Sequence, residues 1–193
     1  MNLNLVIVFF YSYVLGSIPF GLIITKLFLK KDIRNIGSGN IGATNVLRAG
    51  KKSLAALTLL FDILKGYLSV YITLEYASDL IYFAGLICFI AHIFPVWLKF
   101  KGGKGVATYL GIILALSFKL ALIFGFSWLI ILFIFKYSSL SSIFSTLIVF
   151  LSSIIFQNYS LTIFLFMLFV ILLYTHKDNI MRLKNKTENK IKF

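Results

Sequence analysis

The stretch Lys119-Leu-Ala-Leu-Ile-Phe-Gly-Phe-Ser-Trp-Leu-Ile-Ile-Leu-Phe-Ile-Phe-Lys136 decides the fold class, because no charged side chain stands between its two lysines. A helix that crosses a bilayer needs about 20 predominantly apolar residues, and this run approaches that length. Apolar residues make up 60% of the whole chain, and the mean hydropathy is +0.98, which lies outside the range of soluble domains. The sequence therefore predicts an all-α integral membrane protein.

Further apolar runs on both sides of this stretch bring the expected number of transmembrane helices to seven. The run 105–118 is short for a full crossing and almost touches the next run, so a single bent helix is the alternative there. We expect the seven helices to form one domain over residues 1–193. The predicted spans are 3–29, 53–74, 79–98, 105–118, 119–136, 138–156 and 160–176.

Basic residues concentrate in three connecting segments, 30–52, 99–104 and 177–193. With seven spans all three fall on one side of the membrane, and loops rich in lysine and arginine stay in the cytoplasm. We therefore expect the N-terminus outside and the C-terminus in the cytoplasm. Six spans would separate the tail from the other basic segments. The net charge of +13 follows from this topology and favours anionic lipid headgroups as partners, not nucleic acid.

A polar segment after the first run reads Gly37-Ser-Gly-Asn-Ile-Gly-Ala-Thr-Asn-Val-Leu-Arg48. Glycines let backbone N–H groups turn toward an anion, and an arginine fork can close over a phosphate. Asn40, Thr44 and Asn45 supply further donors in a supporting role. The spacing of the glycines matches a dinucleotide-binding pattern, but a membrane helix precedes it, which excludes that fold. The segment is either a phosphate site or an ordinary loop.

Three more polar segments lie at the same predicted membrane face. Lys99-Phe-Lys-Gly-Gly-Lys-Gly105 is basic and rich in glycine, although membrane topology alone would also produce such a loop. The serines of Ser138-Ser-Leu-Ser-Ser142 can cap a helix or donate to a phosphate. His176-Lys-Asp-Asn179 adds an imidazole and an amide, and a histidine at a helix end can serve either chemistry or structure.

Asp62 and Lys65 lie inside the second predicted span, three residues apart, so that their charges can pair on one helix face. The sequence leaves open whether this pair is functional or structural. We expect His92 to be structural. We expect no bound metal, because the polar segments contain few carboxylates apart from Asp32 and Asp178.

Taken together, these segments resemble the PlsY family of bacterial membrane glycerol-3-phosphate acyltransferases, and the resemblance extends along the whole chain. It implies seven spans in the bacterial inner membrane and an active site that faces the cytoplasm. It also implies transfer of a fatty acyl group from acyl phosphate to the 1-hydroxyl of sn-glycerol 3-phosphate. The products would be lysophosphatidic acid and inorganic phosphate, in the first acylation of phospholipid biosynthesis. The matching motifs are Gly16–Gly21, Gly37–Arg48, Asp62–Gly66, Lys101–Thr108, the serines ending at Ser142 and His176–Ile180.

The resemblance also implies roles for individual residues. Residues expected to bind substrate phosphate are Ser38, Arg48, Gly102, Gly103, Lys104, Gly105 and Ser142. Residues expected to be catalytic are His176, Asn179, Ser38 and Lys104. The expected partners are acyl phosphate, glycerol 3-phosphate, the lipid bilayer and, functionally, an enzyme that produces acyl phosphate. No cofactor is expected.

The mechanism and the function each keep one alternative. No Ser-His-Asp or His-x-x-x-x-Asp pattern of other acyltransferases stands out, which favours direct attack by the glycerol hydroxyl. Either His176 or a substrate phosphate oxygen would accept the proton. Lys186 stands where the family usually has glycine, which argues against a site role for Thr187 and Glu188. The alternative function is a carrier for an organic phosphate.

Overall fold

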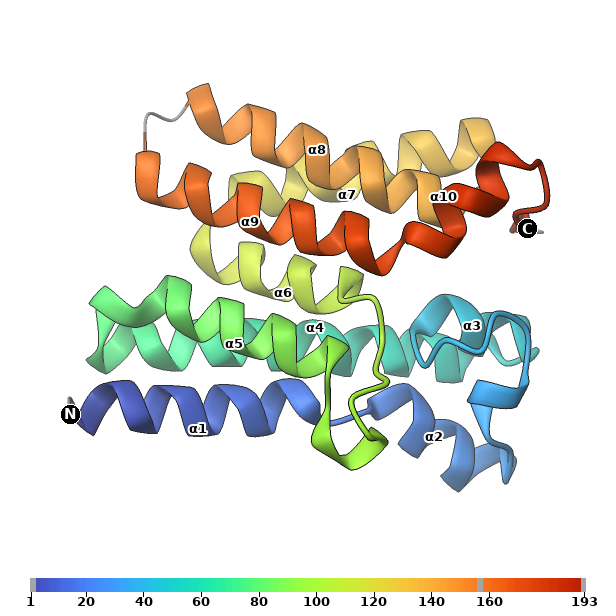
Figure 1. Cartoon of the computed structure of the whole chain (residues 1–193), viewed down its shortest axis with the longest axis horizontal. Helices are drawn as coiled ribbons and strands as arrows, with labels where there is room; N and C mark the ends of the chain where they lie inside the picture. Colours follow the sequence, from blue (N-terminus) through green and yellow to red (C-terminus); the bar gives the residue numbers. More distant parts are fainter. Residues whose placement is uncertain (1–2, 156–157, 192–193) are drawn as a thin grey trace. The chain divides into compact units, whose positions relative to one another are not determined.

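The structure, a computed structural model, describes residues 3–155 and 158–191, and every regular element in these ranges is helical (Figure 1). The chain divides into two compact units, residues 1–116 and 117–193, each built from its own helices. Residue 156, the last of the sixth predicted span, residue 157 of the connection after it, and residues 192 and 193 of the basic tail lie outside the described ranges.

The first unit is arranged around its longest helix, α4. Helices α1, α2, α3, α5 and α6 all pack against α4 or against a helix that does. Two short 3₁₀ turns join neighbouring helices and a third precedes α3. The elements are α1 Leu3–Ser17, α2 Phe20–Leu29, η1 Ile33–Asn35, α3 Ala43–Arg48, α4 Lys52–Tyr76, η2 Ser78–Leu80, α5 Ile81–Ile93, η3 Val96–Leu98 and α6 Val106–Leu116.

The first predicted span is broken between α1 and α2 at Ile18 and Pro19. Proline has no N–H to continue the helical ladder and disfavours helical geometry at the residue before it. The main-chain carbonyls at this break therefore need other partners. α1 and α2 together still form one apolar segment of 27 residues, Leu3–Leu29.

Glycines allow α4 and α6 to approach closely. A Cβ atom on Gly66 of α4 would overlap the carbonyl of Thr108, and one on Gly111 of α6 would overlap the carbonyl of Ile63. Membrane helices that meet through small residues gain their stability from close van der Waals contact, because lipid supplies no hydrophobic drive between helices.

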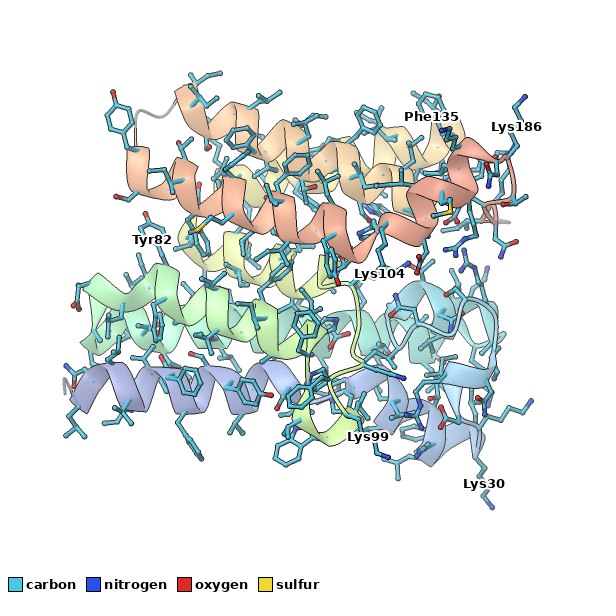
Figure 2. The ribbon with its side chains drawn as sticks, viewed as in Figure 1. Lys30, Tyr82, Lys99, Lys104, Phe135 and Lys186 are labelled. Carbon is cyan, nitrogen blue, oxygen red and sulfur yellow. The ribbon has the colours of Figure 1, made fainter. Side chains whose placement is uncertain are left out.

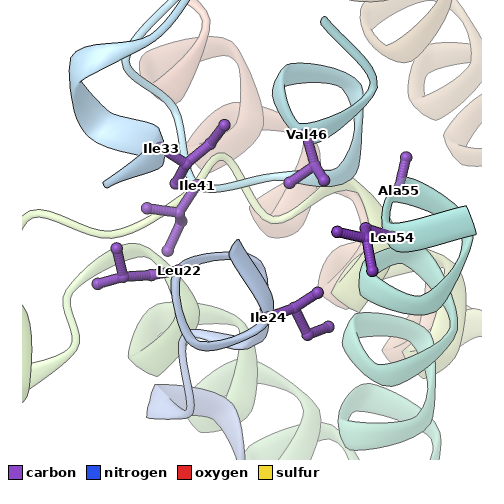
Figure 3. Close-up of a cluster of buried hydrophobic side chains, with 7 residues drawn as sticks. All are labelled: Leu22, Ile24, Ile33, Ile41, Val46, Leu54 and Ala55. Atoms are coloured by element: carbon purple, nitrogen blue, oxygen red, sulfur yellow. The ribbon is translucent and has the colours of Figure 1, made fainter. Parts of the chain in front are cut away.

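A cluster of buried apolar side chains supports the polar segment that follows α2 (Figure 3). Ile41 and Val46 anchor the Gly37–Arg48 segment in this cluster, and Leu98 of η3 packs against it. The cluster therefore serves as a common base for the first polar segment and for the turn that leads into the 99–105 loop. Its members are Leu22, Ile24, Ile33, Ile41, Val46, Leu54 and Ala55.

The second unit consists of α7 Phe118–Phe135, α8 Ser138–Ile155, α9 Tyr159–Thr175 and α10 Lys177–Lys184. α8 packs against both α7 and α9. α9 and α10 meet at an angle of 60°. His176 lies at this bend, between the last residue of α9 and the first of α10.

Among the described residues, five helical segments are long and apolar enough to cross a membrane, and the bent pair α9 and α10 adds a sixth. α6 and α7 are separate helices, because Ser117 is extended and its side chain accepts the N–H of Leu120 at the start of α7. α6 has only 11 residues, so the count of seven crossings and the orientation of the termini stay predictions.

Replacing Gly66 by alanine tests the α4–α6 packing. Gly66→Ala should lower the free energy of unfolding by about 1–3 kcal/mol, because the added methyl forces the two helices apart. Gly125→Ala in α7 is the matched control, since a Cβ there would meet nothing within 4 Å. Thermal unfolding in detergent measures both variants. Equal melting temperatures would contradict the close approach.

Candidate active site

The Asn45 side chain organises the turn that begins at Gly37. Its Oδ1 accepts the backbone N–H of Ser38 at 3.0 Å. Its Nδ2 lies 2.7–3.1 Å from the carbonyls of Ile33, Ile36 and Asn40. Asn45 is only 2% exposed, so these contacts lie inside the protein. Its amide therefore holds the shape of the turn, whereas the sequence predicts it as a further donor to a phosphate.

Ser38 stands on this turn between two glycines in the left-handed region, Gly37 at φ +58° and Gly39 at φ +71°. A Cβ on Gly37 would overlap Oδ1 of Asn45 and would lie 3.5 Å from Cδ of Arg48. The Arg48 side chain, at the end of α3, therefore passes close to Gly37. Ser38 is exposed and Arg48 is half-buried. The structure thus brings the side chain of Arg48 near the turn that carries Ser38.

Asp32 and Arg34, just before this turn, neutralise one another. Arg34 donates from Nε and from Nη2 to the carboxylate of Asp32, the shorter distance being 2.6 Å. The hydrogen bond from Arg34 lowers the pKa of Asp32 to about 2. Asp32 is therefore paired within its own turn, and the charge of Arg34 is compensated there.

The loop from Lys99 to Gly105 folds back on the end of α5 and carries Lys99 and Lys104 (Figure 2). The N–H of Gly102 donates to the carbonyl of Ile93 at 2.9 Å, and the N–H of Gly103 donates to the carbonyl of His92 at 3.0 Å. These two amides, which the sequence assigns to phosphate, hold the loop in this structure. A phosphate contact from either would need its present bond to be exchanged.

Lys104 and Gly105 lead directly into the first turn of α6. The carbonyl of Gly105 accepts the N–H of Tyr109 at 2.7 Å, so Gly105 caps the helix. Its φ of +85° is a conformation that residues with side chains rarely adopt. Amide groups at a helix start carry partial positive charge and favour anions. Lys104, which is half-buried, adds its charge next to this helix start.

In the second unit, a hydrogen bond fixes the ring of His176 at the bend between α9 and α10. Its Nδ1 lies 2.9 Å from the carbonyl of Leu172, and the residue is only 2% exposed. A carbonyl can only accept, so Nδ1 carries the proton. In the neutral ring Nε2 is then the basic nitrogen, which is the state that a general base requires.

Glu188 holds Asn179 in place. Its Oε1 accepts from Nδ2 of Asn179 at 2.6 Å and from Oγ of Ser139 at 2.8 Å. Its Oε2 accepts from Nε of Arg182 at 2.7 Å, and the side chain is only 5% exposed. Burial raises the pKa of Glu188, but these hydrogen bonds outweigh burial, so the net pKa lies below its ordinary value. The carboxylate thus joins α8, α10 and the tail.

The lysine at position 186, in place of the family's glycine, argued against a site role for Glu188. The backbone shows that lysine adopts the conformation that glycine would have there. Lys186 has φ +58°, a left-handed conformation in which glycine is usual. The chain makes the turn with lysine, and Thr187 closes it by donating its N–H to the carbonyl of Arg182 at 2.8 Å. The signal available in the sequence was an isolated carboxylate in a basic tail.

The hydroxyl of Ser142 on α8 has two partners within the second unit. It donates to the carbonyl of Ser138 at 2.9 Å and accepts from the indole N–H of Trp128 at 3.1 Å. Ser142 is 2% exposed. To donate to a phosphate, the Ser142 hydroxyl would have to rotate its proton away from the Ser138 carbonyl. The Trp128 N–H could still donate to the hydroxyl oxygen. Sequence reasoning did not identify Trp128 as a neighbour of this site residue.

Replacing Glu188 by glutamine tests its role in ordering Asn179. Glu188→Gln should lower the free energy of unfolding by about 1–3 kcal/mol at pH 7, because charge-assisted hydrogen bonds are lost. The folded pKa lies below the unfolded value of about 4.3, so the contribution is complete above that pH and is lost as pH falls through the folded pKa.

Thermal unfolding of both proteins in detergent, between pH 7 and pH 3, measures this contribution. The difference between wild type and Glu188→Gln should shrink toward the acid end. Glu75→Gln, which changes an exposed carboxylate at the end of α4, is the control and should match wild type. A difference that does not depend on pH would contradict the assignment.

Comparisons with known proteins agree with this architecture. The family model described as glycerol-3-phosphate acyltransferase matches residues 6–186. A protein of Pelagibacter ubique named glycerol-3-phosphate acyltransferase is 56% identical over 94% of this chain and 94% of its own length.

Two solved structures are similar over nearly the whole chain. Both are crystal structures of PlsY (YgiH), an integral membrane glycerol 3-phosphate acyltransferase. Its glycerol 3-phosphate form has a TM-score of 0.92 and 37% identity, covering 97% of this chain and 96% of its own. Its lysophosphatidic acid form has a TM-score of 0.89 and 36% identity, covering 97% and 95%. The chain belongs to the PlsY family of integral membrane glycerol-3-phosphate acyltransferases.

Proposed function

We propose that the protein transfers a fatty acyl group from acyl phosphate to the 1-hydroxyl of sn-glycerol 3-phosphate. The products are lysophosphatidic acid and inorganic phosphate, in the first acylation of phospholipid biosynthesis. The observation that carries the proposal is the match over nearly the whole chain to an acyltransferase solved in glycerol 3-phosphate and lysophosphatidic acid forms. A carrier for organic phosphate gains no support from this match.

The chemistry fits a site that holds two anionic substrates. Acyl phosphate is a mixed anhydride with a good leaving group, so positioning and charge neutralisation are the main catalytic tasks. The glycerol oxygen attacks the acyl carbonyl carbon and forms the ester bond. The bond between the acyl carbon and the phosphate oxygen breaks, and inorganic phosphate leaves.

The residues of the first unit are suited to binding phosphate. Ser38 lies on the turn beside Gly37, which the Arg48 side chain approaches from the end of α3, and Lys104 with Gly105 stands at the start of α6. The Gly102 and Gly103 amides would add contacts only after exchanging their present carbonyl partners. Asn40 and Thr44 lie in the same segment as Ser38 and support it.

The residues of the second unit are suited to contacting the acceptor and the reacting centre. His176 has its basic nitrogen at Nε2, Asn179 is fixed by Glu188, and the hydroxyl of Ser142 can reorient about Trp128. The proton of the attacking hydroxyl passes to Nε2 of His176 or to a phosphate oxygen of the substrate. Because the glycerol hydroxyl itself is the nucleophile, the acyl group passes directly from donor to acceptor, without a covalent acyl-enzyme.

The membrane placement belongs to the same proposal. We place the N-terminus outside and the C-terminus in the cytoplasm of a bacterial inner membrane, with the site on the cytoplasmic side. The three basic connecting segments support this orientation. Acyl phosphate is labile in water, so the proposed reaction needs an enzyme that produces this donor.

An assay of three donor conditions tests the function. The purified protein is given glycerol 3-phosphate with palmitoyl phosphate, with palmitoyl-CoA or with no donor, and the lipid product is identified by mass. Phosphate release should match lysophosphatidic acid formation and should require palmitoyl phosphate. Product from palmitoyl-CoA alone would overturn the proposed donor. Uptake of glycerol 3-phosphate into sealed vesicles without acyl product would favour a carrier.

A conservative change at Arg48 tests its role in binding phosphate. Arg48→Lys keeps the charge but loses the two-pronged guanidinium, so kcat/KM should fall about 10-fold to 100-fold. Arg34→Lys is the matched control from the same segment, because Arg34 is committed to Asp32, and it should retain wild-type activity. Steady-state kinetics with palmitoyl phosphate measures both. Similar activities for the two variants would remove Arg48 from the site.

A further inference from the structure

Three buried ionisable side chains within the helices of the first unit take no part in the proposed chemistry. Asp62 and Lys65 of α4 are each 2% exposed, and His92 of α5 is 5% exposed. Nζ of Lys65 lies 2.8 Å from Oδ1 of Asp62, and Nδ1 of His92 lies 3.8 Å from the same oxygen. Such groups are expensive inside a membrane helix and usually mark a function. We call these three residues the buried triad.

Lys65 connects the buried triad to the break in the first span. Its Nζ donates to the carbonyl of Ile18 at 2.9 Å, next to Pro19. A second donor reaches the same break, because the indole N–H of Trp97 donates to Oγ of Ser17 at 2.8 Å. Trp97 belongs to η3, which leads into the 99–105 loop. The break is therefore fixed both by α4 and by the turn before the loop.

His92 connects the buried triad to the loop itself. Its carbonyl accepts the N–H of Gly103 at 3.0 Å. Its ring lies against the same glycine, since a Cβ on Gly103 would overlap Nε2 and would lie 2.9 Å from Cε1. Both the main chain and the ring of His92 thus seat Gly103. Lys104 is the next residue, so its position follows from how Gly103 is held.

The Asp62 carboxylate contacts both of the other members of the buried triad. Oδ1 of Asp62 is the shared neighbour of Nζ of Lys65 and Nδ1 of His92. The 3.8 Å between Nδ1 of His92 and Oδ1 of Asp62 is too long for a hydrogen bond, but rotation of the ring would change the electrostatic contact between them. The Asp62 carboxylate therefore lies beside the ring that touches Gly103.

We propose that the buried triad is a positioning device for the loop that carries Lys104. Asp62 and Lys65 act through His92 and the broken first span, and His92 fixes the Gly102–Gly103 backbone so that the Lys104 ammonium meets a substrate phosphate. The identity of that ligand rests on the proposed function. The claim that the buried triad holds the 99–105 loop in place does not depend on that function. This role makes His92 a positioning residue, beyond its expected structural one.

Two variants of His92 and one control test the proposal. His92→Ala removes the ring, so kcat/KM for glycerol 3-phosphate with saturating palmitoyl phosphate should fall about tenfold. His92→Phe restores a planar ring against Gly103 and should recover part of this loss. Ser69→Ala is the control, because Ser69 makes buried contacts between helices, to Ser12 at 3.0 Å, without touching the loop. It should keep wild-type kcat/KM even where its melting temperature falls.

Hydrogen exchange of the amides in residues 99–105 supplies a readout that needs no turnover. His92→Ala should speed this exchange, and Ser69→Ala should not. The variant Asp62→Asn with Lys65→Met, which removes both charges together, should speed it as well. Unchanged exchange in both the His92→Ala and the double variant would overturn the proposal, and so would a kcat/KM of His92→Ala equal to that of the Ser69→Ala control. Wild-type protein that makes no product, with exchange behaving as expected, would instead refute the proposed function.

Discussion

Main chain that leaves helical geometry and is shielded from water must find hydrogen-bond partners from the protein itself, because lipid offers none. The turn at Gly37 meets this constraint with the Asn45 amide, which contacts the backbone of Ser38 and three carbonyls. The 99–105 loop meets it with the carbonyls of His92 and Ile93. The polar groups that shape the two loops are therefore largely spent on the protein, which leaves ligand binding to the side chains that the loops carry.

Predicting the helices from the sequence was straightforward, because apolar runs bounded by charges determine where they begin and end. The run 160–176 corresponds to α9 at Tyr159–Thr175, and the run 53–74 to α4 at Lys52–Tyr76. The break at Ile18 and Pro19 and the 60° bend at His176 lie inside or at the end of such runs. Hydropathy does not register them, since a bend depends on local backbone geometry and not on the average polarity of the segment.

Segments of the candidate site could be picked out in the sequence where glycines and polar residues cluster within a few positions, as in Gly37–Arg48. The site was not predictable where a partner comes from a distant or apolar segment. Trp128 sits in an uninterrupted apolar helix, yet its indole N–H reaches Ser142. Glu188 reaches Asn179 only because Lys186 adopts a left-handed conformation, which no propensity would assign to lysine. The Gly102 and Gly103 amides look available in sequence, and only the fold reveals their partners.

The shortness of α6 has a consequence for the bilayer. Its 11 residues rise by about 16 Å, roughly half of the ~30 Å hydrocarbon thickness. In the proposed topology, in which α6 crosses the bilayer, a helix of that length would create a hydrophobic mismatch, which a membrane relieves by thinning locally or by admitting headgroups and water. Such a thinned zone next to Lys104 and Gly105 would let a water-soluble phosphate and a lipid chain approach one another without either leaving its own medium. Under the proposed function, the thickness of the membrane would then influence the rate of acyl transfer, separately from any side chain.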